Sequence, residues 1–173
     1  MSIKSKLAIV VATLTLTTAG AQAEWMTTVE DDLFSDNKTA VMVSMISMNA
    51  SIYAKCVGPD AVYLAYIEAA GDASSITQPM DAGDIVFKGD NGERFTSKTS
   101  IYRHNDKYVG FSYDDEATVA DAIRDFGEAD SKISVGLDLI TSDEPMTVTV
   151  SARGSSKAVK QFIEACAIVA PNL

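Results

Sequence analysis

Apolar and polar residues alternate along much of this chain, which is the pattern of β-strands that bury one face. Residues 132–140 show the alternation most clearly, with isoleucine, valine and leucine at every second position. Residues 146–152 repeat it, with threonine and serine at the polar positions. Because a face of hydroxyl side chains is wetted by solvent, we expect a sheet that covers its core on one side only.

Other segments rich in β-branched and aromatic residues are bounded by turn-forming residues. They lie at residues 25–29, 39–47, 51–57, 61–67, 84–88, 93–96, 100–103 and 107–113. The segment 61–67 is apolar on both faces, so a central position in the sheet is predicted for it. Asn91-Gly92 predicts a tight hairpin turn with positive φ between 84–88 and 93–96. Together these segments predict a curved antiparallel sheet of about seven to nine strands.

Two segments late in the chain show helical spacing. In residues 115–126, Val119, Ile123 and Phe126 share a face, and Gly127 is expected to end the helix. A second helix is predicted from residues 154–156, which supply the N-cap, to about residue 168. Helices added to an antiparallel sheet give the α+β class, and we expect both to pack on one face of that sheet.

The amino terminus has the layout of a secretory signal. Lys4 and Lys6 precede an apolar run from Leu7 to Ala19, and Ala21-Gln22-Ala23 fits a signal-peptidase site. An apolar run of about 13 residues is too short for a helix that crosses a bilayer. We therefore expect residues 1–23 to be a cleaved signal peptide and residues 24–173 to form a single globular domain. The protein would then be periplasmic or secreted, with no transmembrane span.

The chain holds two cysteines, Cys56 and Cys166. An even number of cysteines in an exported chain indicates a disulfide. Both lie at apolar positions of their elements, one on a predicted strand and the other on a predicted helix. Redox dithiols are usually close in sequence, as in Cys-x-x-Cys, so a structural disulfide bond is the better interpretation.

Charge excludes one class of partner. The 173 residues carry a formal net charge of −10, from 14 basic and 24 acidic side chains. An acidic chain repels phosphate backbones, so no nucleic-acid partner is expected.

The residues needed for several common kinds of catalysis are missing. His104 is the only histidine, and it lies in a predicted turn, where it is expected to be exposed. No Gly-x-Ser-x-Gly motif occurs, and one histidine with a bridged cysteine pair supplies too few zinc ligands. We therefore assign no catalytic residue, no metal site and no cofactor. Aspartate and glutamate are plentiful, so a carboxylate-based hydrolase stays open.

Met42, Met45 and Met48 are spaced three residues apart, as in some exported copper proteins. In a strand, however, Met45 faces away from the other two. We interpret these methionines as residues that fill gaps in the core.

Basic and aromatic residues gather in one predicted hairpin. Tyr102, Arg103, His104, Lys107 and Tyr108 lie within seven positions of an otherwise acidic chain. Tyrosine and arginine are frequent at binding hot spots, so these five residues form the candidate binding site. The alternative is an ordinary solvated hairpin with charges that protect a sheet edge.

The order of several short motifs resembles a known group of exported proteins. These motifs are Trp25 near the mature start, Ser35-Asp-Asn-Lys-Thr39, Tyr53-Ala-Lys-Cys56, Ala129-Asp130 and the closing segment from Ala158 to Cys166. They are similar to motifs of the type VI secretion-associated VasI/TagO group of small two-cysteine proteins. The resemblance implies the α+β fold and the bridge from Cys56 to Cys166, without implying an activity.

The sequence thus predicts a non-enzymatic, soluble periplasmic module that binds an envelope protein or a cell-wall component. A carboxylate-based periplasmic hydrolase and an inhibitor of a hydrolase are the alternatives. A deep pocket with two carboxylates would favour the hydrolase. A rigid protruding loop would favour the inhibitor.

Overall fold

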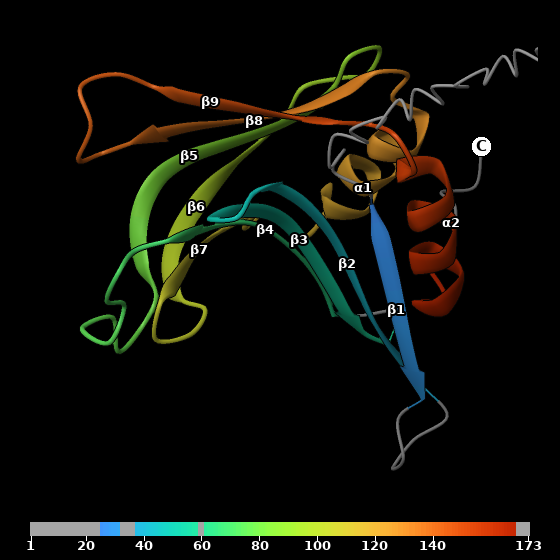
Figure 1. Ribbon diagram of the computed structural model, residues 1–173, viewed down its shortest axis with the longest axis horizontal. Coiled ribbons are helices and arrows are strands. Elements are labelled where there is room, and N and C mark those ends of the chain that lie inside the picture. The colour runs from blue at the N-terminus through green and yellow to red at the C-terminus, as the bar shows by residue number, and fades with distance from the viewer. Residues whose placement is uncertain (1–24, 32–36, 59–60, 169–173) are drawn as a thin grey trace, which may run out of the picture.

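The computed structural model describes residues 25–31, 37–58 and 61–168 (Figure 1). The predicted signal peptide and the predicted first mature residue, Glu24, lie outside these ranges. Among the described residues, no helix has the length and hydropathy needed to cross a membrane.

Nine strands form one sheet in which every neighbouring pair is antiparallel. The strands are β1 Met26–Asp31, β2 Lys38–Ser47, β3 Ala50–Val57, β4 Val62–Ala69, β5 Met80–Gly89, β6 Phe95–Arg103, β7 Tyr108–Ser112, β8 Lys132–Leu139 and β9 Met146–Ser151. Their order across the sheet is β1-β2-β3-β4-β7-β6-β5-β8-β9. Because β4 pairs with β7, the next three strands follow β4 across the sheet in the reverse of their chain order, as β7, β6 and β5.

The sheet curls, and its strands β5 and β6 bend along their length (Figure 1). Alternation then separates a buried inner face from an outer face. Met42, Ala54 and Leu64 are register partners on β2, β3 and β4, and all are buried. We call the face that carries this row the inner face. The α+β class and the curved antiparallel sheet are confirmed, and β4 is central as predicted.

Two helices lie beside each other at the right of Figure 1. Helix α1, Val119–Glu128, contacts β4 and β5, and helix α2, Ser155–Ala165, contacts β1 and β2. The ring of Phe126 on α1 lies 5.6 Å from the ring of Phe87 on β5 and equally far from that of Trp25. The helices therefore share a core with the strands that they contact.

A disulfide joins Cys56, at the end of β3, to Cys166, directly after α2. Both cysteines are fully buried, and the bridge spans 110 residues of sequence. The predicted disulfide is confirmed. It attaches the end of the last helix to β3, the third strand across the sheet.

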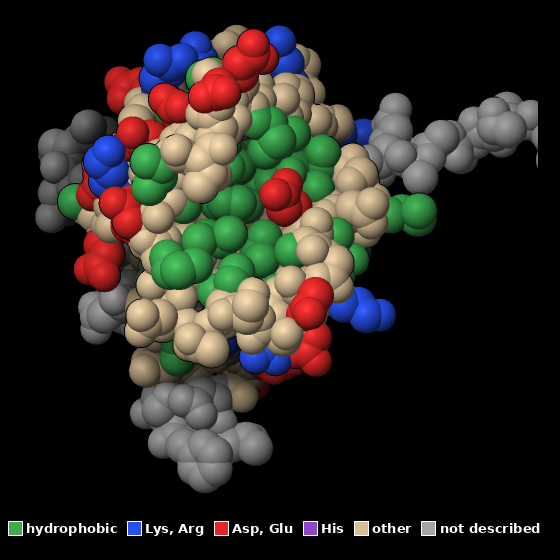
Figure 2. All heavy atoms as spheres, turned by 90° about the vertical axis from the view of Figure 1, so that its left-hand side faces the viewer, with side chains coloured by type: hydrophobic (Ala, Val, Ile, Leu, Met, Phe, Trp, Pro, Cys, Tyr) green, Lys and Arg blue, Asp and Glu red, His purple; other side chains and the backbone are tan. Residues whose placement is uncertain are grey.

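The helices occupy one end of the curled sheet and leave the other end uncovered. There the inner face carries half-buried apolar side chains from five strands. They are Ile46, Ala50, Ile101, Leu139, Met146 and Val148. Figure 2 looks toward this end and shows hydrophobic side chains gathered in a hollow, with an acidic side chain among them. We call this region the open end.

Some predicted local features differ from the structure. The segments 93–96 and 100–103 belong to one strand, β6, rather than to two hairpins. The first helix begins at Val119 and passes through Gly127 instead of ending before it. Asp115 explains the later start, because its carboxylate binds the backbone N–H of Ala117 and the hydroxyl of Thr118 in a separate turn.

The N-cap of the second helix lies in the predicted segment 154–156. Gly154 holds that position with a φ of 86°, and no side chain caps the helix. The hydroxyl of Ser155 is buried without a partner among the described residues, and that of Ser156 donates to the carbonyl of Gly127.

The turn at Asn91-Gly92 does not use positive φ, so the predicted turn type is wrong. Gly92 is needed for another reason. A Cβ at this position would overlap the carboxylate of Asp125 on α1. That carboxylate is buried and accepts a 2.6 Å hydrogen bond from the N–H of Gly89. The glycines therefore let the turn after β5 dock directly onto α1.

The methionines divide as strand geometry requires. Met42 is fully buried, whereas Met45 is 46% exposed and Met48, in the turn after β2, is 87% exposed. Only Met42 fills the core as predicted.

Candidate functional site: a tyrosine-lined pocket on the outer face

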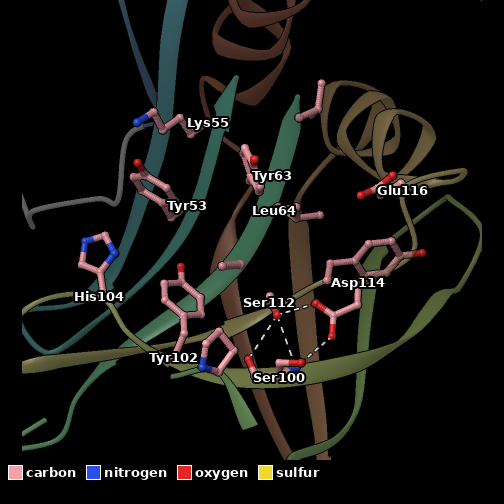
Figure 3. Close-up of a pocket in the computed structure, with 14 residues that line it drawn as sticks. Tyr53, Lys55, Tyr63, Leu64, Ser100, Tyr102, His104, Ser112, Asp114 and Glu116 are labelled. Carbon is pink, nitrogen blue, oxygen red and sulfur yellow. Dashed lines mark hydrogen bonds between the residues drawn. The ribbon is translucent and has the colours of Figure 1, made fainter. Parts of the chain in front are cut away.

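The outer face of the sheet carries a pocket of about 590 Å³ (Figure 3). Its lining comes from β3, β4, β6 and β7, from the segments that follow β6 and β7, and from Pro79 directly before β5. The labelled lining residues are Tyr53, Lys55, Tyr63, Leu64, Ser100, Tyr102, His104, Ser112, Asp114 and Glu116. We call it the tyrosine pocket.

Strand alternation places these side chains. Tyr53 and Lys55 stand on the outer face of β3, between inner-face residues that are fully buried or nearly so. Tyr63 on β4 is the register partner of Lys55. The small residue Ala65 pairs with Tyr53 on one side and with Ser112 on the other, which leaves room above the sheet at this point.

A glycine supports the ring of Tyr102. Gly110 on β7 is its register partner, and a Cβ on Gly110 would collide with the tyrosine ring. The missing side chain lets the ring of Tyr102 lie across the neighbouring strand. Tyr102 is consequently half-buried although it belongs to the outer face.

His104 packs edge-on against two of these rings. Its ring centroid lies 5.4 Å from that of Tyr53 and 6.4 Å from that of Tyr102. Partial burial lowers the pKa of His104, so the imidazole is neutral at pH 7. His104 is exposed, as predicted, but its side chain also lines the pocket.

Burial also keeps the tyrosines protonated. It raises the pKa of Tyr53, and it raises that of Tyr102 to about 12, with a smaller contribution from Tyr53. Both hydroxyls therefore remain hydrogen-bond donors at neutral pH.

Two serines and an aspartate form a polar wall. The hydroxyl of Ser100 donates to one oxygen of Asp114 at 2.8 Å, and the hydroxyl of Ser112 donates to the other. The N–H of Ser100 donates to Ser112 Oγ at 3.3 Å. This network joins β6 to β7 and holds the carboxylate of Asp114 at the pocket (Figure 3).

Several polar groups of the pocket have no partner within the described ranges. They are the hydroxyls of Tyr53, Tyr63 and Tyr102 and the ammonium group of Lys55. The pocket thus combines aromatic faces, donors without protein partners and a carboxylate acceptor. This combination can bind a polar ligand that also presents apolar C–H surfaces.

The five residues predicted from sequence do not lie on one surface. Tyr102 and His104 line the tyrosine pocket, whereas Arg103 belongs to the inner face and pairs with Asp106. The hydroxyl of Tyr108 donates to the carbonyl of Met48 at 3.4 Å, and Lys107 is exposed near the hairpin tip. A binding role for Arg103, Lys107 and Tyr108 stays a prediction.

Sequence reasoning missed most of the pocket. Tyr53 and Lys55 could have been found, because they stand opposite the buried alternation of Ile52, Ala54 and Cys56. Ser100 and Ser112 lie on the two strands of the predicted hairpin, so their proximity agrees with that prediction. Their position beside Tyr53 and Tyr63 could not be predicted, because it depends on the pairing of β4 with β7.

Within residues 25–31, 37–58 and 61–168, no group of three or more histidine, cysteine, aspartate or glutamate side chains is arranged to hold a metal ion. Comparison of the chain with protein-family models, with curated proteins and with solved structures finds no match.

Proposed function

We propose that this protein is a non-enzymatic binding module of the bacterial periplasm, and that its tyrosine pocket binds a glycan of the cell wall. The observation that carries the proposal is the set of tyrosine rings and free hydroxyl donors around a pocket of about 590 Å³. Aromatic faces suit the C–H face of a sugar ring, and hydroxyl groups of a sugar bond well to tyrosine, lysine and carboxylate.

The polar wall supports a saccharide rather than a purely apolar ligand. Asp114 accepts bonds from two serines and retains lone pairs for a ligand hydroxyl. Lys55, at the far side of the pocket, can bind a carboxylate or a carbonyl oxygen. Cell-wall glycans offer both hydroxyl and carboxyl groups.

Two features of the chain support the proposed location. The signal-like segment 1–23 predicts export, and the disulfide between Cys56 and Cys166 suits an oxidising compartment. In this proposal both helices pack on the inner face, which leaves the outer face free to bind the glycan. A link to type VI secretion rests on the sequence resemblance alone.

A carboxylate-based hydrolase is the second candidate, because Asp114 and Glu116 both line the pocket. It differs from the binding module in one respect that is easily measured. A hydrolase consumes its glycan, whereas a binding module returns it unchanged.

The test uses the disulfide-bonded chain from residue 24 and soluble peptidoglycan fragments released by a muramidase. Titration calorimetry should give a measurable affinity for the parent protein. Tyr53→Ala and Tyr102→Ala should weaken it at least tenfold, because each removes an aromatic face and a donor. Tyr108→Ala is the matched control, since this tyrosine lies outside the pocket, and it should bind normally.

Equal affinity of all four proteins, or no binding at all, would remove the glycan proposal. Cleavage of the fragments, abolished by Asp114→Asn or Glu116→Gln, would establish the hydrolase in its place. Arg103→Ala with Lys107→Ala asks whether the hairpin tip adds to binding. If this double variant lost more affinity for the fragments than Tyr53→Ala does, the binding site would lie at the hairpin tip.

A further inference from the structure

The open end of the sheet is a second recess, separate from the tyrosine pocket. The tyrosine pocket belongs to the outer face, whereas the open end belongs to the inner face, where no helix of the described chain covers it. Its apolar lining comes from strands that are distant in sequence. Ile46 is on β2, Ile101 on β6, and Met146 and Val148 on β9.

The strand register places these side chains on one continuous face of the sheet. Ala50 is the partner of Glu68, which is the partner of Val109, which is the partner of Arg103. Leu137 pairs with Met146 on the opposite arm of the curled sheet. Half-buried apolar side chains on a concave sheet face are typical of the binding sites found at the mouths of β-barrels.

Glu68 is the acidic member of this face. Its Oε2 accepts a 3.0 Å hydrogen bond from the hydroxyl of Tyr66, which is buried. Within the described part of the chain, Glu68 forms no ion pair. The nearest basic side chain in the same row, Arg103, already pairs with Asp106. In the part of the chain that the structure describes, the recess therefore holds a carboxylate with no cationic partner.

From this arrangement we infer that the open end binds an amphiphile with a single alkyl chain and an ammonium head group. The alkyl chain contacts Ile101, Met146 and Val148, and the ammonium group pairs with the free oxygen of Glu68. The tail removes apolar side chains from water, and the head supplies the missing cation.

The shape of the recess favours a slender ligand over a second copy of the protein. The apolar side chains lie in a hollow (Figure 2), which a single alkyl chain can enter. Two copies would also bring two carboxylates together in an apolar interface, because each copy contributes its own Glu68. A carboxylate head group is disfavoured for the same electrostatic reason.

The test titrates the disulfide-bonded chain from residue 24 with decylamine, decanoate and hexylamine, each below its micelle concentration. Decylamine should bind at least tenfold more tightly than decanoate. Hexylamine should bind at least tenfold more weakly than decylamine, because each buried CH₂ contributes a factor of about four. In two-dimensional NMR spectra, decylamine should shift the amides of Glu68, Ile101 and Met146.

Two variants separate this site from the tyrosine pocket. Glu68→Gln should reduce the preference for decylamine over decanoate to threefold or less. Glu116→Gln changes a carboxylate of the tyrosine pocket and should leave the preference unchanged. Met146→Ser should weaken decylamine and decanoate alike, since it removes an apolar contact at an edge strand.

Equal binding of decylamine and decanoate, or a preference that survives Glu68→Gln, would overturn the inference. Amide shifts confined to Tyr53, Lys55 and Tyr63 would assign the amphiphile to the other site. Absence of binding together with a dimer in sedimentation analysis would show that a second copy occupies the open end instead.

Discussion

At the scale of single residues, the interior contains a polar group that folding leaves unpaired. Thr99 on β6 is 1% exposed, and its hydroxyl has no hydrogen-bond partner in the described residues. A buried hydroxyl that loses its bonds to water and gains none destabilises the folded state.

Thr99→Val should therefore raise the free energy of unfolding by about 1 kcal/mol, because valine has nearly the same shape without the unpaired hydroxyl. Thr96→Val on the same strand is the control, since Thr96 is exposed to solvent. Urea unfolding of both variants measures the difference. A clear loss of stability in Thr99→Val would mean that the hydroxyl has a partner after all.

Gly92 gives a prediction of the opposite sign. Gly92→Ala should lower the free energy of unfolding by about 2 kcal/mol or more, because the new methyl group must displace the buried carboxylate of Asp125. Gly136→Ala provides the comparison, since the nearest atom to a Cβ there is 3.6 Å away. Thermal unfolding should separate the two variants, and similar melting temperatures would contradict the close approach of Gly92 to α1.

At the scale of elements, Asp90 connects the turn after β5 to the segment between α1 and β8. Its carboxylate accepts hydrogen bonds from the N–H groups of Asp130 and Ser131 and from the hydroxyl of Ser131. The bond from Ser131 is the main cause that lowers the pKa of Asp90 below its ordinary value. A carboxyl whose pKa is lower in the folded state stabilises that state at neutral pH.

This contribution is present above the unfolded pKa of about 3.9 and is lost as the pH falls through the lower folded value. Asp90→Asn should therefore unfold more easily at pH 7, and its stability should fall less than that of the parent protein between pH 6 and pH 2.5. Urea midpoints across this range provide the measurement. Parallel pH profiles for the two proteins would exclude a role for the Asp90 carboxylate.

The elements also show what could be predicted from sequence and what could not. Strand β8 was predicted almost to the residue, because its buried face is an unbroken run of Ile133, Val135 and Leu137. Strand β6 was divided in two, because its buried positions Ser97 and Thr99 are polar and carry no hydrophobic signal. Alternating apolar residues indicate a buried strand face, but buried serine and threonine residues leave no such pattern in the sequence.

The same limit applies to the candidate site. Tyr102 and His104 were singled out for their types and then found in the tyrosine pocket. Tyr53 and Tyr63 lie beside them only because β4 pairs with β7. In this pairing Ala69 lies opposite Tyr108, which is 39 residues further along the chain. A pairing between strands so far apart in sequence is fixed by the whole sheet and not by any local pattern.

At the scale of the whole molecule, the disulfide joins the end of β3 to the residue directly after the last helix. It closes a loop with a sequence separation of 110 residues. In the chain-entropy model, closing a loop of this size restricts the unfolded ensemble and raises the free energy of unfolding by roughly 4–5 kcal/mol. The double variant Cys56→Ala and Cys166→Ala should lose stability on this scale, as measured by urea unfolding. A loss below about 1 kcal/mol would show that packing alone holds α2 in place.

We propose that the tyrosine pocket on the outer face binds a cell-wall glycan. The most direct measurement is a two-dimensional NMR titration of the chain from residue 24 with muramidase-released peptidoglycan fragments. We expect saturable shifts of the amides of Tyr53, Tyr63 and Ser112, with those of Glu68 and Met146 at the open end unchanged. Saturable shifts that map elsewhere, or spectra that do not change at millimolar fragment, would contradict it.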